Sequence, residues 1–374
     1  TPLMHHDLRG RASYPHELLR HFLLEMLETM PPDFRCQVYE GAGSIYHRSG
    51  NNKKAVECFF QAGNDELLLS CELTGLLGET FGSVSYTSLA RRVLRRCSRY
   101  PISMLRLCLA LFAGTDFSGF EEALERSREI VEKTGDEQLM GEWYLLSALG
   151  EFPDIPRMTA RYREAAARMS APSRLFNRRE PYMFGTTSMW YLFYRTPGKM
   201  METAEELRDM LEVYNPLTGH HGAGAYELYM GEALSVQGRF DESDIYAHRA
   251  ALLSEQWQNA TVTYGAALLL GINAIYQSDM ISLQKAIEYL ETKALAYPFL
   301  QHTAINAQMA ETVRTYLLGL MMEPDRSAAW ARGSADMLGD LTFTNFMAKT
   351  NRITDLILKK NYKRAIASVE ASLQ

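Results

Sequence analysis

The feature that constrains the fold most is a helical hairpin over residues 224–253, two short helices joined by a tight turn. Gly238 suits the end of the first helix, because a residue without a Cβ adopts the left-handed conformation at least cost. Asp241 is a candidate N-cap of the second helix, because its carboxylate can accept a hydrogen bond from a free backbone N–H. One hairpin cannot bury the apolar faces of both its helices. We therefore expect copies of it on either side. The apolar residues of its first helix recur at helical spacing along one face: Tyr226, Tyr229, Met230, Ala233 and Leu234.

This hairpin resembles a tetratricopeptide repeat, in which small residues let two helices approach closely and an aromatic ring fills the space between neighbouring hairpins. Ser243 and Ala247 stand where that repeat usually has Ala and a large aromatic residue, so this copy is degenerate. The matching residues are Gly231, Ala233, Gly238, Phe240 and Ala250. Residues 35–63 form a clearer copy, with Tyr39, Gly43, Tyr46, Gly50, Ala55, Phe59 and Ala62 at the signature positions.

The rest of the chain continues the same pattern, with roughly nine hairpins spaced by about 35–45 residues. No segment alternates between apolar and polar residues as a strand does. We therefore predict an all-α fold, a right-handed α-solenoid of tetratricopeptide-like helical hairpins. The other predicted helices span 14–30, 66–77, 88–97, 102–113, 120–133, 137–149, 154–169, 186–194, 199–214, 261–276, 282–295, 303–320, 324–338, 345–358 and 362–373.

Composition and charge narrow the functional classes. The 374 residues exceed what one ordinary compact core holds, which suits an elongated repeat. A net charge of -6 argues against a nucleic-acid clamp, although the arginine-rich helix at 88–97 is open to two interpretations, a nucleic-acid contact or a solvated face. No apolar run approaches the roughly 20 residues of a membrane span, and no signal peptide is visible. Five scattered cysteines are typical of reduced thiols, so we expect a cytoplasmic protein.

Two stretches carry a resemblance to a known family. Residues 14–68 are similar to the junction in MalT-like, LuxR-type transcription activators, where the winged-helix part of an ATPase module passes into helical repeats. Residues 184–200 and 219–243 resemble the same helical region of bacterial members. The matching residues of the junction are His16, Leu19, Phe22 and Leu23, followed by Gly50, Ala55, Ala62, Gly63 and Asn64.

The resemblance implies a sensor segment, since in that family the helical region binds a small inducer and partner proteins and controls ATP-dependent self-association. The sequence lacks a GxxxxGK(S/T) phosphate loop and a recognisable C-terminal helix-turn-helix. We therefore expect a piece of a longer chain, with residues 1–34 a remnant of a preceding winged-helix domain and linker helix, and 35–374 the repeat sensor region. ATP would bind only in a missing upstream domain and DNA only through a missing C-terminal domain. No cofactor and no membrane contact are expected for this segment.

The candidate ligand site lies near the middle of the chain, on the concave side between 186–214 and 224–257. The aromatic run 189–194 is open to two interpretations, core packing or a cavity wall. Nearby arginines suit a carboxylate or phosphate. The histidine pair lies in a glycine-rich loop before a helix N-terminus, where an anion, a metal or simple flexibility are all compatible with the pattern. The predicted ligand-binding residues are Arg178, Arg179, Trp190, Tyr194, His220, His221, Tyr226, Glu227 and Tyr229.

Two functional classes remain open at the level of sequence. No GxSxG or HExxH motif is present, and we expect neither an enzyme nor a metal site. The first class is a sensor of a small effector that also binds protein partners or itself. The second is a general tetratricopeptide scaffold that binds a peptide or protein. A closed, aromatic-lined cavity would favour the sensor, and an open, polar groove would favour the scaffold.

Overall fold

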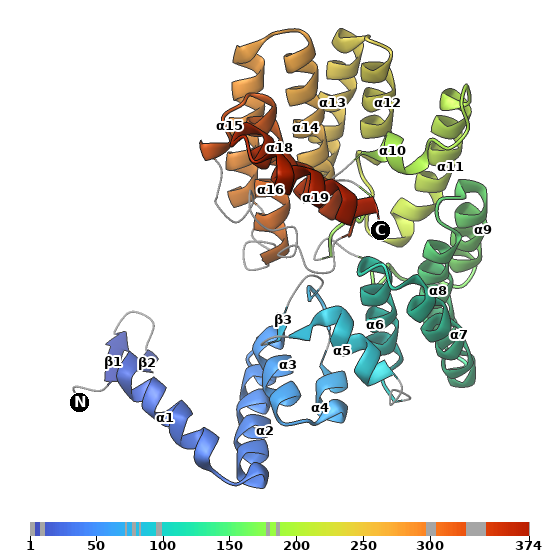
Figure 1. Ribbon diagram of the computed structural model, residues 1–374. Coiled ribbons are helices and arrows are strands. Elements are labelled where there is room, and N and C mark those ends of the chain that lie inside the picture. Colours follow the sequence, from blue (N-terminus) through green and yellow to red (C-terminus); the bar gives the residue numbers. More distant parts are fainter. Residues whose placement is uncertain are drawn as a thin grey trace. The chain divides into compact units, whose positions relative to one another are not determined.

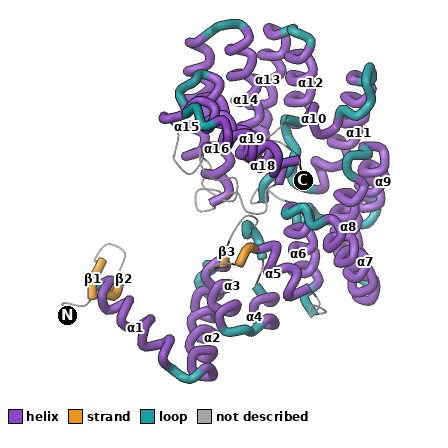
Figure 2. The backbone as a smooth tube through the Cα atoms, in the orientation of Figure 1, coloured by secondary structure: helices purple, strands orange, loops and turns teal. Residues whose placement is uncertain are grey.

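Helices make up most of the computed structural model, as Figures 1 and 2 show. The structure describes residues 4–7, 12–71, 73–76, 80–81, 84–94, 99–176, 180–184, 188–296, 304–326 and 342–373. The predicted helical class is confirmed, although two short β-hairpins are present that the sequence did not predict. Contacts divide the chain into two compact units, Thr1–Leu73 and Thr74–Gln374. Within the described residues, no helix has both the length and the apolar character that crossing a membrane requires.

The first unit begins with an antiparallel hairpin of β1 (Met4–Asp7) and β2 (Ala12–Pro15), in which His5 lies opposite Tyr14. Four helices follow: α1 (Glu17–Thr29), α2 (Pro32–Arg48), α3 (Asn52–Gln61) and α4 (Asp65–Ser70). The helix predicted from residue 14 therefore starts three residues later, where the His16 ring accepts a hydrogen bond from the backbone N–H of Leu18. Pro32 occupies the first position of α2, where its missing N–H costs nothing.

The close approach predicted for the first hairpin is present between α2 and α3. A Cβ added at Gly43 would lie 2.6 Å from a ring carbon of Phe59, so only glycine fits beneath that ring. Asn64 caps α4 through the N–H of Leu67, and its side-chain amide donates to Glu40 across 2.7 Å. This hairpin therefore has the small-residue and aromatic contact that the repeat signature requires.

The second unit contains a small hairpin of β3 (Thr80–Phe81) and β4 (Val84–Ser85), followed by helices. The first helices of this unit are α5 (Tyr86–Val93), α6 (Pro101–Ala113), α7 (Phe117–Thr134), α8 (Glu137–Ser147) with a 3₁₀ turn (Ala148–Glu151), and α9 (Ile155–Ala166). An irregular segment follows, and after it come α10 (Met189–Phe193), α11 (Met200–Leu217), α12 (Ala225–Val236), α13 (Phe240–Gln256), α14 (Ala260–Tyr276), α15 (Met280–Ala296), α16 (Ala304–Leu320), a 3₁₀ turn (Pro324–Arg326), α18 (Thr342–Leu358) and α19 (Tyr362–Leu373).

Successive helices from α12 to α16 pack side by side, as Figure 1 shows. Each contacts the next, and α12 and α16 also both contact α14. Glycines allow these close approaches, since a Cβ at Gly231 would lie 2.7 Å from Leu269, and one at Gly271 would lie 2.7 Å from Leu317. The Ser243 hydroxyl donates to the Gly231 carbonyl across 2.7 Å. Ser243, which departs from the repeat pattern, therefore adds a hydrogen bond where α13 crosses α12.

Several predicted boundaries need correction. The helix predicted at 186–194 is the five-residue α10, which Tyr194 ends in an extended conformation. α11 runs on to Leu217, so the loop predicted at 215–222 is shorter. Asp241 is not the cap of α13, because the helix already begins at Phe240. Gly238 does adopt the left-handed conformation, with φ of 75°. Of the helix predicted at 324–338, residues 327–338 lie outside the described residues.

The arginine-rich helix predicted at 88–97 is α5, which ends at Val93. The Arg91 guanidinium is 2.5 Å from the Asp116 carboxylate at the start of α7, and this ion pair holds the pKa of Asp116 below its usual range. Residues 95–98 lie outside the described residues. Arg91 thus joins two helices of the second unit.

Candidate functional site

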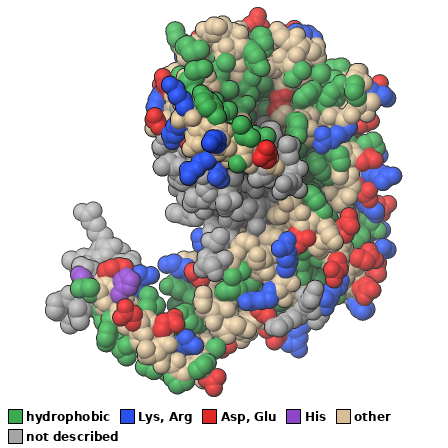
Figure 3. All heavy atoms as spheres, viewed as in Figure 1, with side chains coloured by type: hydrophobic (Ala, Val, Ile, Leu, Met, Phe, Trp, Pro, Cys, Tyr) green, Lys and Arg blue, Asp and Glu red, His purple; other side chains and the backbone are tan. Residues whose placement is uncertain are grey.

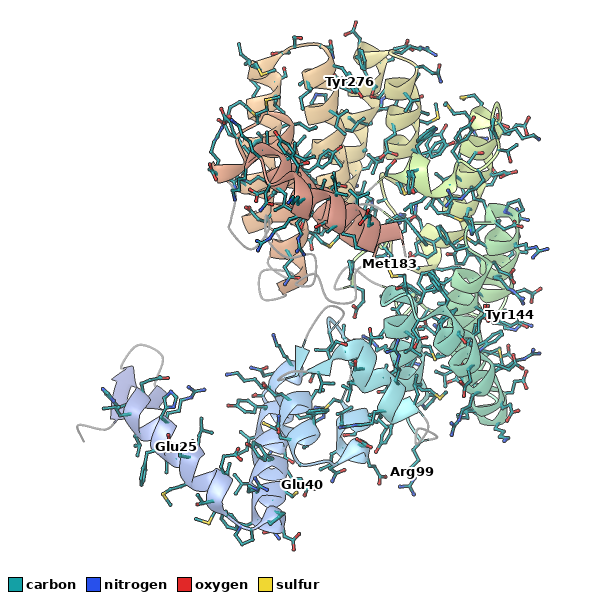
Figure 4. All side chains as sticks on the ribbon, in the orientation of Figure 1. Glu25, Glu40, Arg99, Tyr144, Met183 and Tyr276 are labelled. Atoms are coloured by element: carbon teal, nitrogen blue, oxygen red, sulfur yellow. The ribbon has the colours of Figure 1, made fainter. Side chains whose placement is uncertain are left out.

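A pocket of about 450 Å³ lies between α10, α12, the start of α13 and α14. That volume is within the range typical of small-ligand sites. Figure 3 shows hydrophobic side chains gathered around hollows in the surface over this group of helices, and Figure 4 labels Tyr276 at the end of α14. The lining residues are Ser188, Trp190, Glu232, Ser235, Val236, Gly238, Phe240, Gly265, Leu268, Leu269, Ile272 and Tyr276.

Among the described residues that line this pocket, Glu232 is the one ionisable carboxyl group. Its Oε2 accepts hydrogen bonds from the Ser188 hydroxyl at 3.0 Å and from the Trp190 backbone N–H at 2.6 Å. Burial raises the pKa of Glu232 to about 8, because the lost hydration outweighs these hydrogen bonds. The carboxyl group is therefore mostly protonated at neutral pH.

Ser188 explains how the short helix α10 is held against α12. Its hydroxyl caps α10 by accepting from the Tyr191 N–H at 3.0 Å, and the same hydroxyl donates to Glu232. The cap satisfies one of the free N–H groups at the helix start, and Glu232 satisfies another, that of Trp190. The first turn of α10 is thus anchored to α12 by two hydrogen bonds to one carboxyl oxygen.

Trp190 supplies a buried hydrogen-bond donor at the pocket wall. Its indole N–H has no hydrogen-bond partner among the described residues. The indole ring stacks on Tyr194, with ring centroids 5.2 Å apart, and the Tyr194 hydroxyl accepts from the Gly198 N–H at 2.7 Å. An unsatisfied buried donor costs about 1–3 kcal/mol.

Aromatic and polar contacts also hold together the part of the pocket that α12, α13 and α14 form. Phe240 and Tyr276 stack with ring centroids 5.6 Å apart and an interplanar angle of 12°. The Ser235 hydroxyl donates to Asn273 at 2.6 Å, and the Asn273 amide donates to Ser243 at 2.8 Å. The side chains of α12, α13 and α14 are therefore linked around the pocket.

Among the predicted site residues that the structure describes, Trp190 alone lines this pocket. Tyr194 lies behind it, stacked on the indole ring. Tyr229 is fully buried, and its hydroxyl donates to the Met200 carbonyl at 3.1 Å. Arg178 and Arg179 lie outside the described residues. The structure thus brings Trp190 and Tyr194 together but places Tyr229 in the core.

The two predicted histidines have different surroundings. His220 has a positive φ of 63° and its ring stacks on Trp257, with ring centroids 3.8 Å apart. His221 is buried, with Nδ1 2.8 Å from the Tyr214 hydroxyl and Nε2 2.8 Å from the Glu180 carbonyl oxygen. Burial lowers the pKa of His221 to about 4. The structure therefore shows no metal pair here, and no group of three metal-ligating side chains was found among the described residues.

Tyr226 and Glu227 are half-buried on α12 but do not line the pocket. Burial raises the pKa of Glu227, and the nearby Arg249 acts in the opposite direction. Burial also raises the pKa of Tyr226, with Tyr246 adding to the shift. These two residues therefore lie apart from the Glu232 pocket.

The irregular segment between α9 and α10 is fixed by buried polar contacts. Glu180 forms an ion pair with Arg106 across 3.2 Å, and both side chains are buried. Glu142 accepts from the Ser173 hydroxyl at 2.5 Å and from the Arg174 N–H at 2.6 Å. Figure 4 labels Met183 in the same segment. These contacts attach the described residues of this segment to α6, which carries Arg106, and to α8, which carries Glu142.

A second, larger pocket of about 580 Å³ lies between α13, α14 and α15. Its acidic groups already have partners. Asp244 accepts from Asn273 at 2.7 Å, and Glu255 accepts from Lys293 at 2.5 Å. The polar lining residues are Asp244, His248, Glu255, Gln277, Asp279, Ser282, Lys285 and Tyr289. This groove is more polar than the Glu232 pocket and is the second candidate site.

Sequence reasoning missed Glu232, Ser188, Phe240 and Tyr276 as site residues. One signal for Glu232 was available, because it is an acidic residue in α12 whose neighbours from Leu228 to Leu234 are buried. The other three are brought to the pocket from segments far apart in the chain. Comparison of the chain with protein-family models, with curated proteins and with solved structures finds no match.

Proposed function

We propose that this chain is the effector-sensing region of a MalT-like, LuxR-type transcription regulator and that the Glu232 pocket binds its small effector. The observation that carries the proposal is that Glu232 and Trp190, whose backbone N–H donates to this carboxyl group, together line a largely apolar pocket of about 450 Å³. A few polar groups in an apolar cavity are what a small-ligand site requires. The regulator class rests on the resemblance of residues 14–68, 184–200 and 219–243.

The same proposal includes a right-handed solenoid of tetratricopeptide-like hairpins. The side-by-side packing of α12 to α16, and the contacts of α12 and α16 with α14, support it. The pocket takes residues from α10, α12, α13 and α14, which belong to neighbouring hairpins. A ligand that contacts all four would favour one angle between those hairpins, because it binds that arrangement more tightly than others. Protein partners, or a second copy of the regulator, would respond to that angle.

A cytoplasmic regulator is part of this proposal. Cys36 and Cys58 are free thiols, as expected in a reducing compartment. DNA binding and ATP binding are not assigned to the residues of this chain.

The proposal is tested by thermal-shift screening of the 374-residue chain against metabolites grouped as amines, carboxylates, sugars and nucleosides. Hits are then titrated by calorimetry with the wild type and with Trp190→Ala. We expect at least one hit whose affinity falls in the variant. If no compound in any group binds, or if every hit binds Trp190→Ala as tightly as the wild type, the proposed effector site is wrong.

The polar groove between α13, α14 and α15 favours the second candidate function, a scaffold for a peptide or protein. Lys285 and Asp279 lie within one groove large enough for a peptide segment. If a captured protein partner loses affinity in Lys285→Ala but not in Trp190→Ala, the scaffold function is the correct one.

A further inference from the structure

We infer that the Glu232 pocket selects ligands that carry a protonated amine on an aromatic or apolar body. This inference rests on the proposed effector function, whose pocket it uses. It concerns the chemical class of the ligand, which neither the fold nor the sequence resemblance defines.

The charge of the pocket is the first argument. Among the lining residues, Glu232 is the acidic group, and no Lys, Arg or His is present. α10 contributes Trp190, α13 contributes Phe240, and α14 contributes Tyr276. At the start of α13, Arg239 and Glu242 lie on either side of Phe240 in sequence and form an ion pair with each other, and Asp244 is bonded to Asn273 and lines the other groove. An anionic ligand would therefore find no basic side chain among the described lining residues to compensate its charge.

The aromatic rings are the second argument. Trp190 and the stacked rings of Phe240 and Tyr276 all line the pocket. Aromatic faces attract ammonium groups through their quadrupoles, and Trp is the strongest of them. A carboxyl group among three aromatic rings, without a basic residue in the lining, is the combination that recognises an amine. The apolar floor of Leu268, Leu269 and Ile272 suits the body of such a ligand.

The unequal use of the two carboxyl oxygens is the third argument. Oε2 accepts from both Ser188 and Trp190, so Oε1 is the oxygen with capacity left for the proton of the neutral acid or for a donor on a ligand. An ammonium ligand would take the place of that proton as the donor to this oxygen, and the released proton would pass to the buffer while the ligand kept its own charge.

Amine binding should consequently depend on pH. Burial holds the pKa of Glu232 near 8, and the causes of that shift are burial and hydrogen bonds from Ser188 and from the N–H groups of Met189 and Trp190. Below that pH the acid must lose a proton before it can pair with an ammonium group. The affinity for an amine should therefore rise by up to about tenfold per pH unit between pH 6 and pH 8, and then level off.

The experiment is calorimetry of the 374-residue chain with four probes at pH 6, 7 and 8. Tryptamine and phenethylamine carry the amine, phenylpropanol is the neutral analogue, and phenylpropionate is the acidic one. Buffers of different ionisation enthalpy report the released proton. We expect the amines to bind at least about tenfold more tightly than both analogues at pH 8, with release of close to one proton at pH 6.

Two substitutions on the same helix separate the site from general effects. Glu232→Gln should weaken tryptamine binding by about tenfold or more and remove its pH dependence. Glu227→Gln is the matched control, because Glu227 is also half-buried on α12 but does not line the pocket. It should leave tryptamine affinity within about twofold. Circular dichroism and the melting temperature verify that both variants fold.

The outcomes distinguish the ligand class from the proposed function. If phenylpropanol or phenylpropionate binds as tightly as phenethylamine, or if Glu227→Gln weakens tryptamine as much as Glu232→Gln, the amine inference is wrong. If no amine binds but a sugar or nucleoside binds in a manner that depends on Trp190, the inference fails and the effector function stands. If no compound of any class binds, both are wrong.

Discussion

The backbone N–H of Trp190 lies 2.6 Å from Oε2 of Glu232, a residue 42 positions later in the chain. This hydrogen bond joins the five-residue helix α10 to the middle of α12. Glu232 therefore both anchors the segment that carries Trp190 and lines the pocket that Trp190 borders. A ligand that changes the protonation or position of Glu232 would act directly on the attachment of α10.

Trp190→Ala should weaken binding of the effector by about tenfold or more, since a buried aromatic contact contributes about 1–2 kcal/mol. Helix content by circular dichroism should remain nearly unchanged. Trp257→Ala is the matched control, because Trp257 stacks on His220 and does not line the pocket. Loss of folding in Trp190→Ala, or an equal loss of affinity in Trp257→Ala, would favour the interpretation that the aromatic run is part of the core.

Glu232 should make the protein less stable as the pH rises. Its pKa is about 8 in the folded chain, compared with 4.5 for an ordinary glutamate, so the folded state retains a proton that the unfolded state has lost. The free energy of unfolding should therefore decrease between pH 4.5 and pH 8. Glu232→Gln removes this contribution. Urea unfolding across that range should show a smaller decrease in the variant, and identical slopes in the two proteins would contradict the buried, protonated carboxyl group.

His221 acts in the opposite direction. Its pKa is about 4 in the folded chain and 6.5 ordinarily, so the unfolded state binds the extra proton. The stability that the neutral ring provides is complete above pH 6.5 and is lost as the pH falls toward 4. His221→Gln should lower the free energy of unfolding by about 1–3 kcal/mol at pH 7, because the Tyr214 and Glu180 contacts are disturbed. It should also flatten the acid limb, which is the fall in that free energy between pH 6.5 and pH 4.

The neighbouring variant His220→Gln serves as the control for that acid limb. The His220 ring stacks on Trp257, and Tyr214 bonds to His221 instead. Urea unfolding of His220→Gln should give the wild-type slope between pH 4 and pH 6.5. If His220→Gln flattens the acid limb as much as His221→Gln does, the assignment to His221 is wrong.

Gly224→Ala should destabilise the fold by about 3 kcal/mol, the sum of left-handed strain and a backbone clash. Gly224 has a φ of 83°, and an added Cβ would lie 2.6 Å from the carbonyl oxygen of Ala250. Gly238→Ala is matched in conformation, with φ of 75°, but its Cβ would meet no atom within 4 Å. It should cost only about 1 kcal/mol. Equal losses in urea unfolding would show that the helix crossing at Gly224 is not tight.

The sequence predicted the hairpins well where local signals coincide. The period of the apolar residues and glycines such as Gly43 and Gly238 indicated helix positions that the structure confirms, whereas the predicted cap Asp241 was wrong. Two kinds of error have local reasons: the short strands were missed, and α10 was predicted too long. The strands β1 and β2 have four residues each, too few for their alternation to be distinguished from an irregular terminus. α10 ends after five residues, although its sequence would allow a longer helix.

The site was only partly predictable, because its geometry depends on distant partners. Trp190 was identified from the local density of aromatic residues. Glu232 was not, since its anchoring role comes from Ser188, which lies 44 positions away. His221 resembled a loop ligand in the sequence, but Tyr214 and Glu180 bury it. Spacing along a helix reports which residues share a face, and it does not report which other helix covers that face.

The most direct test of the account follows Trp190 itself during binding. The 374-residue chain contains four tryptophans, so incorporation of fluorotryptophan gives four fluorine NMR signals, and a Trp190→Phe variant assigns one of them. On titration with the tightest compound from the metabolite screen, the Trp190 signal should shift saturably with the dissociation constant found by calorimetry, while those of Trp143 and Trp257 stay unchanged. If the compound binds by calorimetry but the Trp190 signal remains unchanged and another shifts, the effector site is not the Glu232 pocket.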